Sequence, residues 1–213
     1  MKRWRRLMGM KQILVMVVVL VLKAQSVVAD EKPIADPIVE KAIRKSLKKP
    51  EGQLTEADLE KVTSLNLGGT QITDEGIKEV AKLKQLDSLL LYNTKITDKS
   101  LKDVAKLQNL RVLWLHDNKI TDEGLKEVAK LQNLTGLTLD DTKITDAGLV
   151  ELAKLQNLLF LNMTNTEITD ASLMELVKLQ KLLKLGLDNS KVTEEALAEL
   201  KKVMHPNCKI TGP

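Results

Sequence analysis

A 24-residue pattern repeats six times along most of this 213-residue chain. The copies follow one another without insertion and begin at Leu65, Leu89, Leu113, Leu137, Leu161 and Leu185. Self-similarity at a fixed period of about 20 to 50 residues is typical of arrays in which each repeat contacts only its neighbours. The repeat therefore predicts a stack of similar coils rather than a single core built from distant segments.

Within each copy, apolar residues first recur every second residue and then about every 3.6 residues. Residues 113–115 alternate and predict a short strand, whereas Leu125, Val128, Ala129 and Leu131 follow helical spacing. A strand and a helix of this size cannot bury their apolar faces alone. Stacking the copies buries both faces and pairs the strands in parallel.

The array is expected to curve, because paired strands lie about 4.8 Å apart while packed helices need about 8–10 Å. This mismatch places the sheet on the concave side and the helices on the convex side. The predicted fold class is α/β, a curved solenoid.

Two polar positions recur in every copy. A hydroxyl residue followed by an acid, as in Thr121-Asp122, predicts a helix N-cap with a favourable charge in the first turn. A second position follows the strand, where a short polar side chain is expected to bind loop backbone of the adjacent coil. It is occupied by Thr70, Thr94, Asn118, Thr142, Thr166 and Ser190.

The stretch LWLHDNKITDEGLKEVAKLQNL, residues 113–134, resembles leucine-rich repeats of the ribonuclease-inhibitor-like or cysteine-containing class. More narrowly, it is similar to the repeats of secreted bacterial leucine-rich-repeat proteins. The resemblance covers residues 54–213, with Thr or Asn where the cysteine-containing class carries Cys. It implies a right-handed solenoid that binds partners on its concave face.

Residues 1–29 have the layout of a secretory signal peptide: a basic start, an apolar run from Ile13 to Leu22, and small residues ending at Ala29. The apolar run is shorter than the roughly 20 residues of a membrane-spanning helix. We expect cleavage after Ala29, export to the periplasm or the medium, and no stable membrane span afterwards.

The remaining chain divides into a linker (30–36), a helical N-terminal cap (37–64), the six repeats (65–208) and the end of a C-terminal cap (209–213). Without the first 29 residues, Lys plus Arg falls from 33 to 27 against 29 acids, a net charge of −2. Nucleic-acid binding needs a clustered basic footprint, so we expect none. Cys208 has no intramolecular partner and is expected to be a buried small side chain.

Neither catalysis nor a cofactor is predicted, since the chain has no phosphate loop, HExxH, CxxC or GxSxG motif. His116, Thr138 and Asp140 could mimic a nucleophile constellation, but nothing specifies a pocket or an oxyanion hole. Asp and Asn side chains gather at a loop edge, where calcium binding stays open beside the simpler reading of turn-forming residues. They are Asn93, Asp117, Asp141, Asn165 and Asn189, with Asp140 and Asp188 one residue before this position.

Three aromatic residues remain after residue 29: Tyr92, Trp114 and Phe160. Their positions between the inward leucines predict that they project from the concave sheet face, where they form a candidate binding site. The predicted partner-binding residues are Leu90, Tyr92, Val112, Trp114, His116, Asp117, Thr138, Asp140 and Phe160.

The sequence thus favours an exported, monomeric module that binds a protein or peptide on its concave face. Two alternatives remain open. The array could act as a structural or envelope-associated spacer, or an exposed Trp and Tyr with nearby Asn and Asp could bind a glycan.

Overall fold

The structure is a computed structural model that describes residues 33–212. Residues 34–213 form one compact unit by themselves. The expected signal peptide and most of the expected linker lie outside the described residues.

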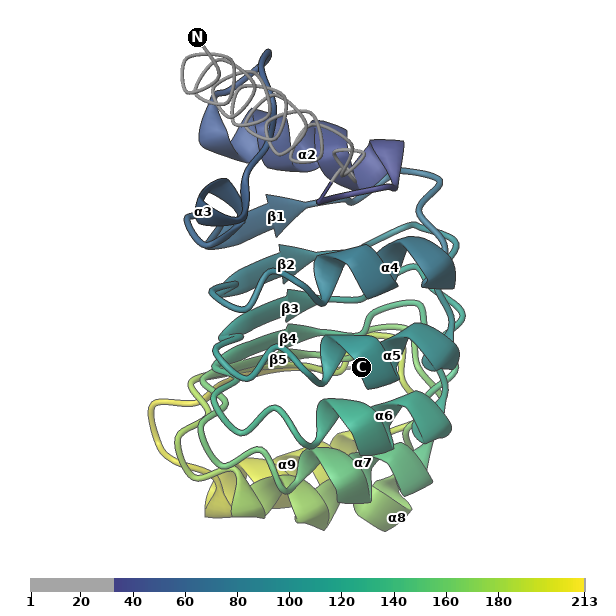
Figure 1. The fold of residues 1–213 in the computed structure, drawn as a ribbon. Coiled ribbons are helices and arrows are strands. Elements are labelled where there is room, and N and C mark those ends of the chain that lie inside the picture. Colours follow the sequence, from purple (N-terminus) through teal and green to yellow (C-terminus); the bar gives the residue numbers. More distant parts are fainter. Residues whose placement is uncertain (1–32, 213) are drawn as a thin grey trace, which may run out of the picture. The chain divides into compact units, whose positions relative to one another are not determined.

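Seven short strands form one parallel sheet in chain order (Figure 1). The first leucines of the six copies are aligned in the register of the sheet, as Leu65 with Leu89 and Leu89 with Leu113. The strands are β1 (Ser64–Asn66), β2 (Ser88–Leu90), β3 (Val112–Trp114), β4 (Gly136–Thr138), β5 (Phe160–Asn162), β6 (Lys184–Gly186) and β7 (Lys209–Thr211).

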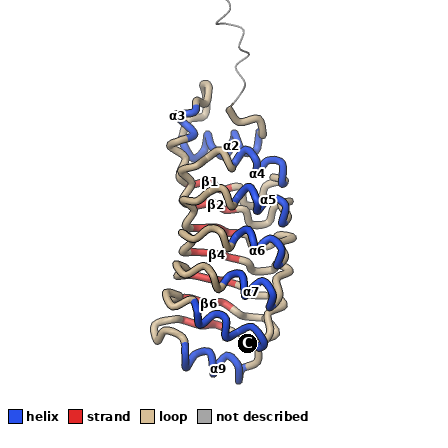
Figure 2. The backbone as a smooth tube through the Cα atoms, turned by 60° about the horizontal axis from the view of Figure 1, so that its bottom comes forward, coloured by secondary structure: helices blue, strands red, loops and turns tan. Residues whose placement is uncertain are grey.

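One helix follows each of the first six strands, on the side of the stack opposite the sheet (Figures 1 and 2). The predicted α/β solenoid is therefore confirmed. The helices are α4 (Asp74–Val80), α5 (Asp98–Val104), α6 (Asp122–Val128), α7 (Asp146–Leu152), α8 (Asp170–Leu173), which continues as the 3₁₀ helix η1 (Met174–Lys178), and α9 (Glu194–Val203).

The core is a continuous layer between the sheet and the helices. The inward side chains of the third copy, Leu113 and Leu115 from the strand and Leu125 and Val128 from α6, are at most 1% exposed. Burying one such side chain stabilises the fold by roughly 1.5–3 kcal/mol. Repetition of these positions in each copy extends the core along the whole stack.

The predicted N-caps are confirmed in five of the six copies. The hydroxyl of Thr121 accepts a hydrogen bond from the backbone N–H of Glu123, whereas Thr73 makes no such bond. In the first five copies, the aspartate after the threonine also accepts hydrogen bonds from the next coil, which the sequence did not predict. Asp98 accepts hydrogen bonds from the backbone N–H and the hydroxyl of Thr121 in the next coil, at 2.9 and 2.7 Å.

This aspartate ladder connects each coil to the next. The equivalent bonds join Asp74 to Thr97, Asp122 to Thr145, Asp146 to Thr169, and Asp170 to Thr193. It also explains the glycines in the first turns of α6 and α7, Gly124 and Gly148. A Cβ on Gly124 would collide with the carboxylate of Asp98 from the preceding coil.

The expected bonding of the polar position after each strand is wrong for its threonines. The hydroxyls of Thr70, Thr94, Thr142 and Thr166 donate to the carbonyl three residues earlier in their own coil. Only Asn118 bridges two coils, because its longer amide donates to the carbonyl oxygen of Leu91 and accepts from Thr94. Ser190 Oγ is buried without a partner among the described residues.

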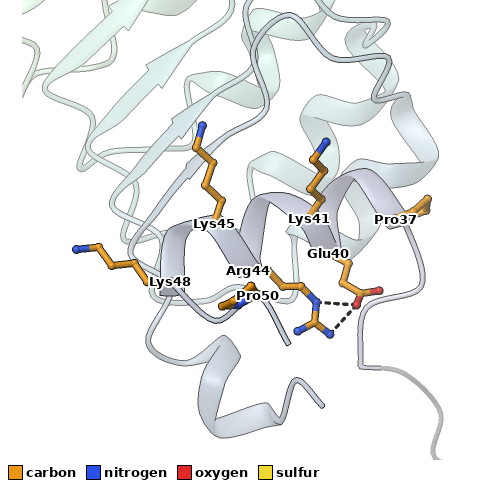
Figure 3. A pocket seen from close by; sticks show the side chains of 7 residues that line it. All are labelled: Pro37, Glu40, Lys41, Arg44, Lys45, Lys48 and Pro50. Atoms are coloured by element: carbon orange, nitrogen blue, oxygen red, sulfur yellow. Dashed lines mark hydrogen bonds and ion pairs between the residues drawn. The ribbon is translucent and has the colours of Figure 1, made fainter. Parts of the chain in front are cut away.

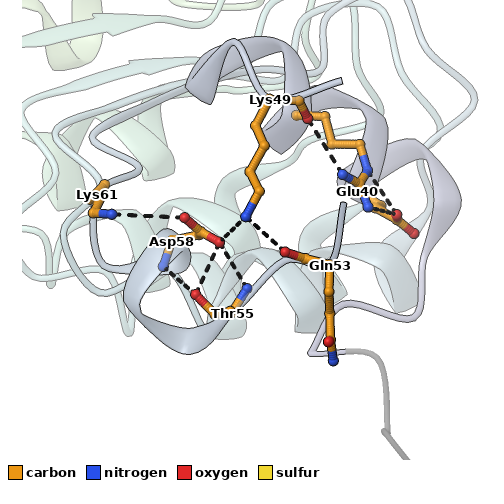
Figure 4. Close-up of polar contacts among 7 residues, drawn as sticks. Glu40, Lys49, Gln53, Thr55, Asp58 and Lys61 are labelled. Atoms are coloured by element: carbon orange, nitrogen blue, oxygen red, sulfur yellow. Dashed lines mark hydrogen bonds and ion pairs between the residues drawn. The ribbon is translucent and has the colours of Figure 1, made fainter. Parts of the chain in front are cut away.

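The N-terminal end of the stack is covered by α2 (Pro37–Leu47) and α3 (Glu56–Leu59). Asp36 caps α2 by accepting hydrogen bonds from the N–H groups of Ile38 and Val39. At α3, Thr55 and Asp58 cap each other's backbone, and Lys49 Nζ lies 2.7 Å from Asp58 (Figure 4). The hydrogen bond from Lys49 lowers the pKa of the Asp58 carboxyl.

At the C-terminal end, the structure adds an element that the sequence analysis did not predict. Residues after Pro206 depart from the repeat, yet β7 (Lys209–Thr211) still pairs with β6 as a seventh strand. Ile210 takes the place of the usual leucine opposite Leu185. Within residues 33–212 no helix is both long and apolar enough to cross a membrane.

Candidate functional site

The outward residues of the sheet fall into three rows that run across the strands. The middle row, Leu90, Trp114 and Thr138, is aligned by direct strand pairing. The row at the start of the strands contains Val112, Gly136 and Phe160. A third row, containing Tyr92, His116 and Asp140, comes two residues after the strands end. Tyr92 therefore lies beyond the end of its strand, since β2 ends at Leu90.

Tyr92, Trp114 and His116 form an aromatic cluster. The rings of Tyr92 and His116 are stacked, with centroids 4.9 Å apart and planes within 1° of parallel. The Trp114 ring lies 6.2 Å from Tyr92 and 6.0 Å from His116, tilted by about 50° to each. The stacking distance is close to the spacing of neighbouring strands, so the solenoid itself holds these rings in contact.

The cluster presents Trp114 to solvent. One face of Tyr92 is covered by His116, and its ring passes over Gly68, where an added Cβ would collide with it. Trp114 is 37% exposed and is supported by the other two rings. Trp114 is therefore the part of the cluster that is most available to a ligand.

Thr138 is not the exposed contact residue that the sequence analysis expected. It is only 7% exposed, and its hydroxyl lies 2.9 Å from Nδ1 of His116. All three residues of β4 are buried, because Gly136 and Thr138 are small and lie between the larger outward residues of β3 and β5. The contact places the Thr138 hydroxyl where it can orient the His116 ring. Its burial also argues against the hydroxyl acting as a nucleophile.

Two carboxylates flank His116: Asp117 follows it in the chain, and Asp140 takes the equivalent position in the next coil. Asp140 is half-buried, and this burial raises the pKa of its carboxyl, although its own backbone N–H, His116 and Thr164 act in the opposite direction. Asp117 is exposed and follows His116 directly. Both acids favour a ligand that carries a positive charge or hydrogen-bond donors.

The remaining predicted residues extend the face. Leu90 and Val112 are half-buried on β2 and β3. Phe160 lies on β5, two strands from Val112, and Lys184 Nζ lies 5.3 Å above the centre of its ring. Its ring contact is with Lys184, so the structure does not bring Phe160 into the aromatic cluster.

The Asp and Asn side chains at the loop edge have a backbone explanation. Asn93, Asp117, Asp141, Asn165 and Asn189 all have φ between 48° and 57°. This left-handed region favours Gly, Asn and Asp over other residues. Within residues 33–212, no group of three or more His, Cys, Asp or Glu side chains is arranged to hold a metal ion.

Comparison with known proteins gives consistent matches to leucine-rich repeats. A family profile described as "Leucine Rich repeats (2 copies)" matches residues 108–154. A second, described as "Leucine Rich repeat", matches residues 59–81 and 154–177. Among curated proteins, none matches the sequence.

Two solved structures are similar over most of the chain. Internalin C2 from Listeria monocytogenes is 30% identical with a TM-score of 0.61, over 83% of this chain and 82% of that one. A leucine-rich-repeat protein from Leptospira interrogans is 31% identical with a TM-score of 0.58, over 72% of this chain but 38% of its own length.

Proposed function

We propose that this chain, which belongs to the leucine-rich-repeat family, binds a protein or peptide on its sheet face at the aromatic cluster. The family supports a role in protein–protein interaction. We propose this surface as the binding site because the indole of Trp114 is exposed and rests against the rings of Tyr92 and His116.

Trp114 departs from its own repeat. The equivalent outward position carries Asn66, Leu90, Thr138, Asn162 and Gly186 in the other copies. The scaffold therefore does not require an aromatic side chain there. Exposed Trp residues that are supported by neighbours are typical binding hot spots.

The size of the face predicts a moderate affinity. Seven strands about 4.8 Å apart, each three residues long, offer a flat area on the order of 300 Å². A standard interface buries about 800 Å² per partner. A partner that contacts only this face is therefore expected to bind weakly, and contacts with the Asp117 loop edge would strengthen the complex.

We further propose that the chain acts outside the cytoplasm as a monomer. The signal-peptide pattern of residues 1–29 supports export to the periplasm or the medium. A glycan is the alternative ligand, since Trp114 could stack on a sugar ring beside Asp140. A spacer without a specific ligand is the alternative from a different class.

The test starts with a photo-crosslinking residue at Leu90 on the sheet face, and with the same residue at Met174 as a control on the convex face. Met174 is 55% exposed and lies on the opposite side of the coil. We expect residues 30–213 to capture a specific protein from an envelope extract through position 90 alone. If both positions crosslink to the same proteins, or if neither position crosslinks to any protein, the result would favour a structural spacer without a specific ligand.

Affinity for the captured partner is then measured by calorimetry. Trp114→Ala should weaken binding by about 2 kcal/mol, roughly 30-fold, with a nearly unchanged melting temperature. Met174→Ala is the matched control and should change neither quantity. Unchanged affinity in a folded Trp114→Ala protein would move the site away from the aromatic cluster.

A further inference from the structure

The outer side of the cap helix α2 carries a row of lysines, Lys41, Lys45 and Lys48, which we call the basic face (Figure 3). All three are exposed, and none has an ion-pair partner among residues 33–212. Many lysines of the repeat helices differ in this respect. Lys78, Lys82, Lys106, Lys126, Lys130, Lys154, Lys178 and Lys202 each pair with an acid three residues earlier.

Two acidic groups of the cap already bind other basic residues, whereas Glu51, Glu56 and Glu60 are exposed and come after the end of α2. Glu40 binds Arg44 on the same helix at 2.8 Å, and Asp58 binds Lys49 at 2.7 Å (Figures 3 and 4). From Pro37 to Lys49 the chain carries five basic residues and one acid. The basic face is therefore a local positive surface on a protein whose repeats are largely charge-balanced.

Packing holds the basic face in a fixed orientation. Val39 and Ile43, on the opposite side of α2, are completely buried in the core. At the end of the helix, the backbone N–H of Lys48 donates to the carbonyls of Arg44 and Lys45. Lys41 and Lys45 are one turn apart on the same face of α2, and Lys48 projects from the C-terminal end of the helix (Figure 3).

We infer that the basic face binds the headgroups of an anionic phospholipid bilayer. The basic face and the headgroups would be complementary only in charge, since the row of lysines contains no exposed aromatic or large apolar side chain. A specific protein partner normally needs such an anchor. A bilayer does not, because its anionic groups are numerous and move laterally to meet fixed cations. An exported chain, as proposed above, meets such surfaces.

The expected strength follows from the number of cations. Each Lys near an anionic bilayer strengthens partitioning about fivefold at moderate ionic strength. Three lysines together therefore predict about a 100-fold effect. Because the attraction is screened over about 10 Å at 0.1 M salt, binding should weaken steeply as salt is added.

The experiment measures co-sedimentation of residues 30–213, which include the compact unit, with phosphatidylcholine vesicles containing 30% or no phosphatidylglycerol. The test variant is Lys41→Gln, Lys45→Gln and Lys48→Asn. Asn is used at position 48 because this residue has φ of 53°, which Asn tolerates. The control, Lys95→Gln, Lys119→Gln and Lys143→Gln, removes the same charge from exposed lysines of the repeats.

We expect binding only to the anionic vesicles, about a 100-fold loss in the test variant and at most a few-fold loss in the control. Trp114→Ala should bind vesicles normally, which separates this surface from the proposed partner site. Equal binding to both vesicle types, or equal losses in both triple variants, would overturn the inference. Binding to soluble polyglutamate without binding to anionic vesicles would overturn it in favour of an acidic protein partner.

Discussion

Thr138, the last residue of β4, and Leu139, the residue directly after it, are both buried but by different neighbours. Leu139 points into the core and is completely buried. Thr138 points to the sheet face and is covered by neighbouring side chains, with its hydroxyl against His116. Exposure at this surface therefore depends on the size of the neighbours as well as on which face a residue occupies.

Substituting each residue should show that core burial of Leu139 contributes more to the free energy of unfolding than coverage of Thr138 on the sheet face. Leu139→Ala leaves a cavity in the core and should lower the free energy of unfolding by roughly 2–5 kcal/mol. Thr138→Ala removes one hydrogen bond beneath His116 and should cost about 1 kcal/mol. Denaturant melts measure both values. Equal losses would contradict the strand register described above.

Tyr92 and Trp114 also differ, although both are aromatic residues on one face. Tyr92 is half-buried between Gly68 and His116, so its removal would disturb the cluster as well as any ligand contact. Trp114 rests on the other two rings and is more exposed. Trp114 is therefore the better residue for testing binding without a change in stability.

At the scale of the element, coils are joined by side chains as well as by strand pairing. From Thr97 onward, each helix N-cap threonine donates to the aspartate of the preceding coil, so one residue pair connects two helix ends. The carboxylate of Asp146 is partly buried, but hydrogen bonds from Ser172 and Thr169 outweigh that burial and lower its pKa. Such bonds to a charged group contribute more than neutral ones, about 1.5–3 kcal/mol each.

The cap helix α3 should contribute a pH-dependent part of the stability through Asp58. Its pKa is lower in the folded chain, chiefly because Lys49 donates a hydrogen bond to it. The stabilisation is therefore fully present above the unfolded pKa, near 4, and is lost as the pH falls below it.

Asp58→Asn should lower the melting temperature at pH 6. It should also reduce the loss of melting temperature between pH 6 and pH 2, since the substituted side chain no longer binds a proton. Thermal melts of both proteins at the two pH values measure this. Glu56→Gln, on the same short helix but outside the Lys49 contact, is the control. An identical acid response in wild type and Asp58→Asn would show that the cap does not depend on this carboxylate.

At the scale of the whole molecule, the two surfaces proposed here lie on different parts of the unit. The aromatic cluster occupies the sheet face in the second and third copies, whereas the basic face lies on the cap helix before the first copy. Binding at either surface is therefore expected to leave the other available.

Export is the remaining whole-molecule prediction. Signal cleavage after Ala29 should produce a mature chain that begins at Asp30. N-terminal sequencing of the protein from a native extract, with its fractionation between cytosol and envelope or medium, measures this directly. A chain retaining Met1 in the cytosol would contradict both the cleavage and the proposed location.

Much of the architecture could be predicted because each copy repeats the same local signals. The leucines at strand spacing, the apolar residues at helical spacing and the Thr-Asp pairs specify one coil, and six copies in register leave one way to stack them. The parallel sheet, the helix layer and the inward leucines followed from these patterns. The neighbouring positions of Tyr92, Trp114 and His116 also followed, because 24-residue spacing aligns equivalent residues.

Contacts between coils required the tertiary structure. The sequence predicted that Asp98 favours a helix end, but only the stacking distance brings it within reach of Thr121, 23 residues later. The same holds for Thr138, which is buried because the side chains beside it on neighbouring strands are larger. The sequence by itself determined which residue types point inward and outward along each coil. Side-chain reach between coils decided which outward residues are covered, and so left Trp114 exposed.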